Sequence, residues 1–177
     1  MLNRELLEQQ MMELPIVQYE YFKTEELIFT EKVRYICRTE CSQYGKSWAC
    51  PPGVGTVEEC REKCLSYPNA LLITTMTEVS DIANVEETLA TRHEHEEVTR
   101  AVKALMDAQQ VETYVLSTES CAICERCTYP DAPCRFPEEL IPSVESYGIF
   151  VNELAASAGI PYISGPNTVT YFGLLLY

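Results

Sequence analysis

Apolar and polar positions follow two different periods along the chain, and together they predict both strands and helices. The short apolar run "ALLITTM" at residues 70–76 contains β-branched side chains and is typical of a buried central strand. Two further strands are expected at residues 111–118 and 168–177, and extended segments are expected at Gln18–Phe22 and Val33–Ile36. These runs predict a sheet whose central strand is buried.

Helical spacing of the other apolar residues predicts four helices, at residues 2–13, 57–65, 81–109 and 144–158. Thr56 is a good N-cap residue, with Glu58 in the turn that follows it. Ser143 has the same role for the last helix, which ends before Gly159. Because strands alternate with helices, we expect one mixed α/β domain over residues 1–177, with two cysteine-rich, metal-binding loops inserted into it.

The charge of the chain narrows the choice of partners. A net charge of −14 disfavours nucleic acid and anionic membrane surfaces, because both attract basic proteins. The first residues lack the apolar run of a signal peptide, and no run of about 18 apolar residues predicts a membrane-spanning helix. We therefore expect a cytoplasmic protein whose partner is a redox protein or a small-molecule substrate.

Nine cysteines are the most unusual feature of the composition. A cytoplasmic location keeps thiols reduced, and an odd number of cysteines cannot pair completely into disulfides. A chain of 177 residues can also bury an adequate core without covalent crosslinks. Metal binding is therefore the leading interpretation. Five of the nine cysteines lie in residues 32–64, where six basic residues outnumber four acidic ones and can offset the charge of thiolates.

The stretch "CAICERCTYPDAPCRFP" contains Cys121, Cys124, Cys127 and Cys134, which are called the four-cysteine group below. Two consecutive C-x2-C steps allow one tight loop to direct three thiolates at one object, as in bacterial-type ferredoxins. Six residues separate Cys127 from Cys134, whereas the ferredoxin run has about three at this point, and the longer loop can return the fourth thiolate to the same cluster. We expect a [4Fe–4S] cluster here, with zinc or free redox thiols as alternatives.

Cys37, Cys41 and Cys50 in "CRTECSQYGKSWACPP" form a less regular set, called the three-cysteine group below. The rigid Pro-Pro pair after Cys50 fixes the direction of that residue. Cys60 and Cys64, one helical turn apart, are candidates for a fourth ligand, or else they are partly buried thiols on an apolar helix face. If only three thiolates bind, one coordination position stays open to water or substrate, as in catalytic metal sites.

Other residues with useful chemistry have simpler interpretations. His93 and His95 point in nearly opposite directions on a helix, so both are expected to be solvated side chains and not shared metal ligands. Tyr44 and Trp48 are close to cysteines in the sequence and are expected to shield a site or to fill the core. The sequence has neither a serine-nucleophile motif nor a dinucleotide-binding fingerprint.

Several sequence blocks occur in an order that resembles one family. They are "C-x3-C-x2-YGK-x3-CPP" at 37–52, the C-x2-C-x2-C run with a later "CRFP", "PSVESYGI" at 142–149, and "TYFGLLL" near the C-terminus. This order resembles the predicted metal-binding proteins of the domain of unknown function 2284 (DUF2284), which occur largely in anaerobes. The resemblance implies metal or iron–sulfur binding by both cysteine groups, and it places Cys60 and Cys64 outside the family pattern. Ile141 stands where relatives carry a basic residue.

These observations lead to three hypotheses about function. The first is an iron–sulfur protein that transfers electrons, with a cluster at the four-cysteine group and a second cluster or metal at the three-cysteine group. The second is an enzyme in which an open iron or other metal at Cys37, Cys41 and Cys50 binds substrate as a Lewis acid. The third is an interaction module that zinc stabilises without redox chemistry.

Overall fold

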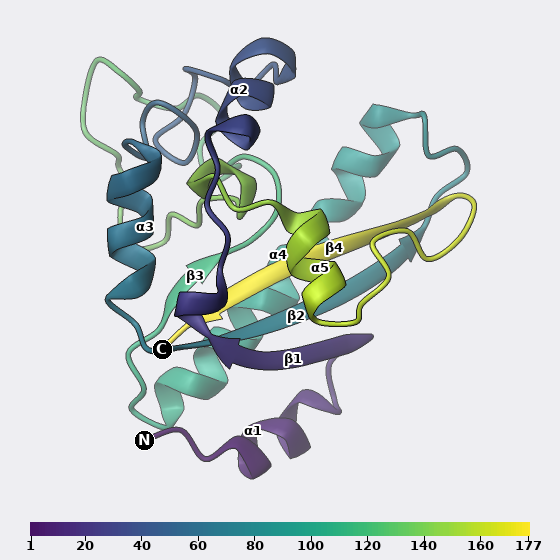
Figure 1. Ribbon diagram of the computed structural model, residues 1–177. Helices are drawn as coiled ribbons and strands as arrows, with labels where there is room; N and C mark the ends of the chain where they lie inside the picture. Colours follow the sequence, from purple (N-terminus) through teal and green to yellow (C-terminus); the bar gives the residue numbers. More distant parts are fainter.

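The apolar run at residues 70–76 lies at the centre of a four-stranded antiparallel sheet, as its composition predicts. The computed structural model describes residues 1–177 except for the side chain of Val85. Its strands are β1 (Gln18–Lys23), β2 (Asn69–Glu78), β3 (Tyr114–Leu116) and β4 (Thr168–Leu176). The strand order is β1-β2-β4-β3, so β2 and β4 are central (Figure 1). The strand predicted at 111–118 is therefore present but shorter than expected.

Helices lie on both faces of this sheet, which confirms the predicted mixed α/β fold (Figure 1). They are α1 (Arg4–Met11), α2 (Glu31–Glu40), α3 (Val57–Leu65), α4 (Val85–Ala108) and α5 (Val151–Ser157), with 3-10 turns η1 (Thr24–Glu26) and η2 (Glu145–Tyr147). The helices predicted at residues 2–13, 57–65 and 81–109 are confirmed, two of them with shorter ends. In the described part of the chain, no helix is both long enough and apolar enough to cross a membrane.

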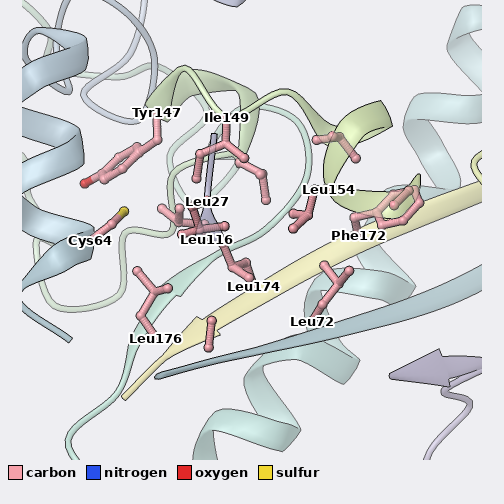
Figure 2. Close-up of a cluster of buried hydrophobic side chains, with 14 of the residues drawn as sticks. Leu27, Cys64, Leu72, Leu116, Tyr147, Ile149, Leu154, Phe172, Leu174 and Leu176 are labelled. Carbon is pink, nitrogen blue, oxygen red and sulfur yellow. The ribbon is translucent and has the colours of Figure 1, made fainter. Parts of the chain in front are cut away.

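Alternation along β2 divides its side chains between two apolar clusters. Leu71 and Ile73 pack with residues of α1 and α4, whereas Leu72 packs with residues of α3 and α5. Figure 2 shows Leu72 in the second cluster together with Phe172 and Leu174 of β4. Full burial of one such leucine or isoleucine stabilises a fold by about 1.5–3 kcal/mol. The central strand pair is therefore buried on both faces. It packs against α3, which follows the loop of the three-cysteine group, and β4 pairs with β3, which precedes the loop of the four-cysteine group.

Residues 33–36, predicted to be extended, lie instead in α2, so this prediction is wrong. Thr30 caps the helix, because its Oγ1 accepts a hydrogen bond from the Lys32 N–H at 3.2 Å. Glu31 lies in the first turn, where the helix dipole favours an acidic side chain. Val33 is buried while most of the helix surface is exposed. The cap and this one-sided burial outweigh the strand preference of the local side chains.

The single helix predicted after Ser143 is also wrong, because the segment is broken in two. Ser143 does cap a turn, since its Oγ accepts a hydrogen bond from the Ser146 N–H at 3.0 Å, but α5 begins only at Val151. Gly148 separates the two parts with φ of +78°, in the left-handed region that favours glycine. A Cβ atom on Gly148 would lie 3.0 Å from Cγ2 of Val57, so glycine also allows close packing against α3.

The expectation of a solvated side chain holds for His93 but is wrong for His95. His93 is exposed, and its Nε2 lies 3.1 Å from Glu97 Oε1. His95 is only 1% exposed because it lies between α4 and the sheet. Its Nδ1 is 2.8 Å from Thr75 Oγ1, and its Nε2 is 3.3 Å from Thr99 Oγ1. Burial lowers the pKa of His95 to about 4, so the ring is neutral at pH 7.

Substitution His95→Gln should reduce the acid sensitivity of the fold. The pKa of this histidine is about 4 in the folded state, against an ordinary value of 6.5, so its contribution to stability is complete above pH 6.5 and is lost as the pH falls toward 4. Between pH 7 and pH 4, the free energy of unfolding should fall by about 3 kcal/mol more in the wild type than in the variant. Chemical denaturation at several pH values measures this difference, and parallel pH curves for the two proteins would contradict it.

Candidate metal centre

The three-cysteine group is positioned by the end of α2 and by the turn-rich loop after it. Cys37 lies in the second half of the helix, and Cys41 follows one turn later at the C-cap, where its N–H donates to the Cys37 carbonyl oxygen at 3.3 Å. Further along, the Gly45 N–H donates to the Pro51 carbonyl oxygen at 2.8 Å and closes the loop. Gly45 has φ of +70°, which suits glycine. This closure returns Cys50 to the end of the helix.

The three thiols of this group line one cavity of about 330 Å³, called the larger cavity below. Burial, together with the nearby Cys41 and Cys37 thiols, raises the pKa of Cys50 to about 12. Burial also raises the pKa of Cys37. The fold thus brings together the three cysteines that the sequence grouped, while their role as metal ligands stays a prediction.

All four cysteines of the other group line a second cavity of about 20 Å³, called the smaller cavity below. Each of the four side chains is half-buried. Burial alone would raise the pKa of Cys127, but hydrogen bonds from the Tyr129 and Trp48 N–H groups and from the Ser47 hydroxyl hold it below its usual value. The loop therefore already directs hydrogen-bond donors at one of the predicted ligands, whose metal binding stays a prediction.

Trp48 connects the two cysteine loops. Its indole Nε1–H donates to the Ala132 carbonyl oxygen at 3.0 Å, and its ring meets Tyr129 edge to face, with 4.8 Å between the ring centroids.

A turn from Ser47 to Cys50 brings the two cavities together. The Cys50 N–H donates to the Ser47 carbonyl oxygen at 3.2 Å, and such a turn places the two Cα atoms within about 7 Å. Ser47 lines the smaller cavity and Cys50 lines the larger one, so the two cavities are neighbours.

Cys60 and Cys64 lie in the core and line neither of these two cavities. The Cys60 sulfur accepts a hydrogen bond from Arg34 Nη2 at 3.2 Å, and its thiol donates to the Val54 carbonyl oxygen at 3.4 Å. Cys64 is fully buried, and Figure 2 shows it near Tyr147 in the cluster beside α3. Both positions favour the interpretation of buried thiols on an apolar helix face over that of a fourth ligand.

Two glutamates that sequence reasoning did not single out also line the larger cavity. Glu119 lies two residues before the four-cysteine group and has φ of +60°, which is uncommon for a residue other than glycine. Glu145 belongs to the block "PSVESYGI", of which Ser143 and Ser146 line the same cavity. Burial, with a contribution from nearby Glu119, raises the pKa of Glu145 to about 7. The block carries a family resemblance, but the spacing of these two acids forms no recognisable motif.

The chemistry of the donor set fits a thiophilic metal. Thiolates are soft ligands that select iron–sulfur clusters, zinc and copper(I). Within the described residues, no three cysteine, histidine, aspartate or glutamate side chains form a group that could hold a metal ion. The thiols surround two adjacent cavities instead of meeting at one point.

A mixed α/β fold with two neighbouring thiol-lined cavities has the features of a cysteine-rich, metal-binding class of protein. The family model for DUF2284, described as a predicted metal-binding protein, matches residues 20–177. The chain belongs to this family, which confirms the resemblance carried by its motifs. No curated protein and no solved structure matches the chain.

Substitution Gly53→Ala should disturb both cysteine groups at once. A Cβ atom on Gly53 would lie 2.7 Å from the Ser47 carbonyl oxygen and 3.1 Å from both the Cys50 carbonyl oxygen and the Trp48 Cα. Because these are backbone atoms, the Ser47–Cys50 turn has to shift. We expect the free energy of unfolding to fall by about 1–3 kcal/mol, and bound metal to be lost from both groups. Denaturation and metal analysis after anaerobic purification measure the two effects.

Gly165→Ala is the matched control for this substitution. A Cβ atom on Gly165 would come no closer than 3.4 Å to a neighbour, the side-chain oxygen of Thr168. This variant should keep the stability and metal content of the wild type. If Gly53→Ala does the same, the turn does not set the geometry of the two groups.

Proposed function

We propose that this protein is an iron–sulfur protein that exchanges electrons with a redox partner protein, and that a [4Fe–4S] cluster is held by Cys121, Cys124, Cys127 and Cys134. The observation that carries the proposal is that four cysteines with ferredoxin-like spacing surround one small cavity. The three-cysteine group would hold a second cluster or metal in the neighbouring cavity. When bound, a cluster would supply one-electron redox chemistry.

The spacing of the ligands supports a cluster over zinc. Structural zinc sites usually combine two separated pairs of ligands, whereas Cys121, Cys124 and Cys127 follow one another at a constant interval. The nine-residue stretch between Cys124 and Cys134 contains the turn at Thr128, whose carbonyl oxygen accepts a hydrogen bond from the Ala132 N–H at 3.0 Å. This turn reverses the chain, and Cys134 lines the same cavity as the first three cysteines.

The surroundings of the smaller cavity suit a negatively charged group. Backbone N–H groups of Trp48 and Tyr129 and the hydroxyl of Ser47 are directed at the Cys127 sulfur. Arg135 lines the cavity as well, and its Nη1 donates to the Arg126 carbonyl oxygen at 2.9 Å. Hydrogen bonds and nearby positive charge stabilise thiolate ligands and are among the factors that set cluster potentials. These residues would therefore stabilise the reduced state of the group that the four cysteines hold.

The larger cavity favours a second candidate function, an enzyme that acts at the three-cysteine group. Its volume of about 330 Å³ falls within the range of small-molecule sites, which is about 300–1,000 Å³. Three protein ligands leave a coordination position free in catalytic metal sites. In that case Glu119 and Glu145, which line the same cavity, would bind and orient a substrate beside Cys50.

Metal and sulfide analysis of protein purified without oxygen tests the proposed cluster. We expect about four iron and four acid-labile sulfide ions per chain if the four-cysteine group alone holds a [4Fe–4S] cluster, and about eight of each if both groups do. A visible absorption spectrum should show the brown colour of thiolate-bound iron. Colourless protein that contains stoichiometric zinc and no sulfide would contradict the proposal and favour a zinc-stabilised module.

Substitution Cys124→Ala should remove about four iron and four sulfide ions per chain, because it deletes one ligand of the proposed cluster. Cys64→Ala is the matched control, since Cys64 is fully buried in the core and lines neither cavity. That variant should keep its iron and sulfide and show only a lower thermal midpoint. Equal metal loss in the two variants would indicate general unfolding, and no loss in Cys124→Ala would exclude this residue as a ligand.

A further inference from the structure

The larger cavity has an acidic lining with no basic residue in it. Among the described residues that form its wall, Glu40, Glu119 and Glu145 carry carboxyl groups, and none is a lysine, arginine or histidine. Arg92 attracts Glu119 from α4, but it does not line the cavity. An anionic ligand would therefore meet charges of its own sign in a partly enclosed site, which is electrostatically costly.

Around Glu145, the polar groups of this wall leave hydrogen-bond acceptor capacity free. The Ser146 hydroxyl donates to the Ser143 carbonyl oxygen at 2.7 Å, so its proton is already used within the block. Ser143 in turn donates to the Glu145 carboxyl group. A carboxylate can accept about four hydrogen bonds, and Glu145 therefore retains acceptor capacity toward the cavity. Glu119 adds a second carboxyl group to the same wall.

The remaining wall of the larger cavity is apolar and partly aromatic. Ile36, Phe150 and Tyr162 line it. The ring of Tyr162 is held by stacking on Phe172, with 5.7 Å between the ring centroids and 14° between the planes. Aromatic faces attract cations as well as apolar groups. The cavity thus combines a surface for an apolar substituent with acceptors for a positive charge.

We propose that the larger cavity binds a small organic ammonium ion with an apolar substituent, whose N–H groups donate to the carboxyl groups of Glu119 and Glu145 while the substituent packs against Phe150 and Tyr162. Ammonium–carboxylate hydrogen bonds are short and about twice as strong as neutral ones. Where it implies that this cation meets a metal at the three-cysteine group, the inference rests on the proposed function. Binding itself does not require that the group holds iron.

Three probes of similar size and different charge test the proposal. They are benzylamine, benzyl alcohol and benzoate, titrated calorimetrically without oxygen into the full-length protein at pH 7, with iron, zinc and sulfide measured on the same sample. Benzylamine should bind at least about tenfold more tightly than benzoate, with benzyl alcohol between them. Benzoate binding as tightly as benzylamine, or no binding of any probe, would overturn the proposal.

Isosteric variants locate the binding site. Glu119→Gln and Glu145→Gln should each weaken benzylamine binding by about three- to tenfold and change benzyl alcohol binding little, because each replaces a carboxyl group that can pair with the ammonium ion by a neutral amide. Glu13→Gln is the control, since it removes an equal charge at an exposed position after α1. Equal benzylamine affinity in wild type and in both cavity variants would contradict the proposed site.

A variant at an exposed residue of the wall separates an effect of charge from an effect of misfolding. Asn152 lines the cavity but is exposed, so Asn152→Lys should fold normally and place a positive charge in the wall. It should weaken benzylamine binding and strengthen benzoate binding, and an unchanged order of affinities would count against the proposal. If benzylamine binds to protein that lacks iron and sulfide, the proposed function fails while this inference stands. If iron and sulfide are present and no probe binds, this inference fails while the proposed function stands.

Discussion

The turn from Ser47 to Cys50 is the constraint on which both cysteine groups depend. The hydrogen bond from the Cys50 N–H to the Ser47 carbonyl oxygen keeps the two residues close, and each faces a different cavity. Trp48, between them, donates to the Ala132 carbonyl oxygen and so ties the turn to the loop of the four-cysteine group. The two groups therefore form one structural unit, although about 70 residues separate them in the sequence.

The two cavities differ in the charge that they favour. Around Cys127, backbone N–H groups, a hydroxyl and nearby Arg135 stabilise negative charge. Around Cys50, burial and neighbouring thiols raise the pKa, and the carboxyl groups of Glu119 and Glu145 share the wall. Metal binding at Cys50 would have to displace a proton, so affinity there would fall at low pH. This contrast supports the proposal that the smaller cavity holds an electron-carrying group and that the larger cavity is open to a ligand.

Local signals predicted much of the fold but less of the candidate site. The N-cap at Thr56 and the apolar run of β2 act within a few residues, and both elements occur as expected. The burial of His95 depends on how α4 packs on the sheet, which the period of the helix alone does not reveal. Glu119 and Glu145 come from distant segments, so only the tertiary fold shows that they share a cavity with the cysteines. The grouping of the cysteines around two cavities was predictable because cysteine spacing is a local property of a loop, whereas their role as ligands stays a prediction.

The most direct test of this account is anomalous diffraction, at the iron and zinc absorption edges, from crystals grown without oxygen. The account predicts strong iron density in the smaller cavity, surrounded by Cys121, Cys124, Cys127 and Cys134, and a second metal peak beside the three-cysteine group. Zinc density without iron in the smaller cavity, or no metal density near these four cysteines, would contradict it.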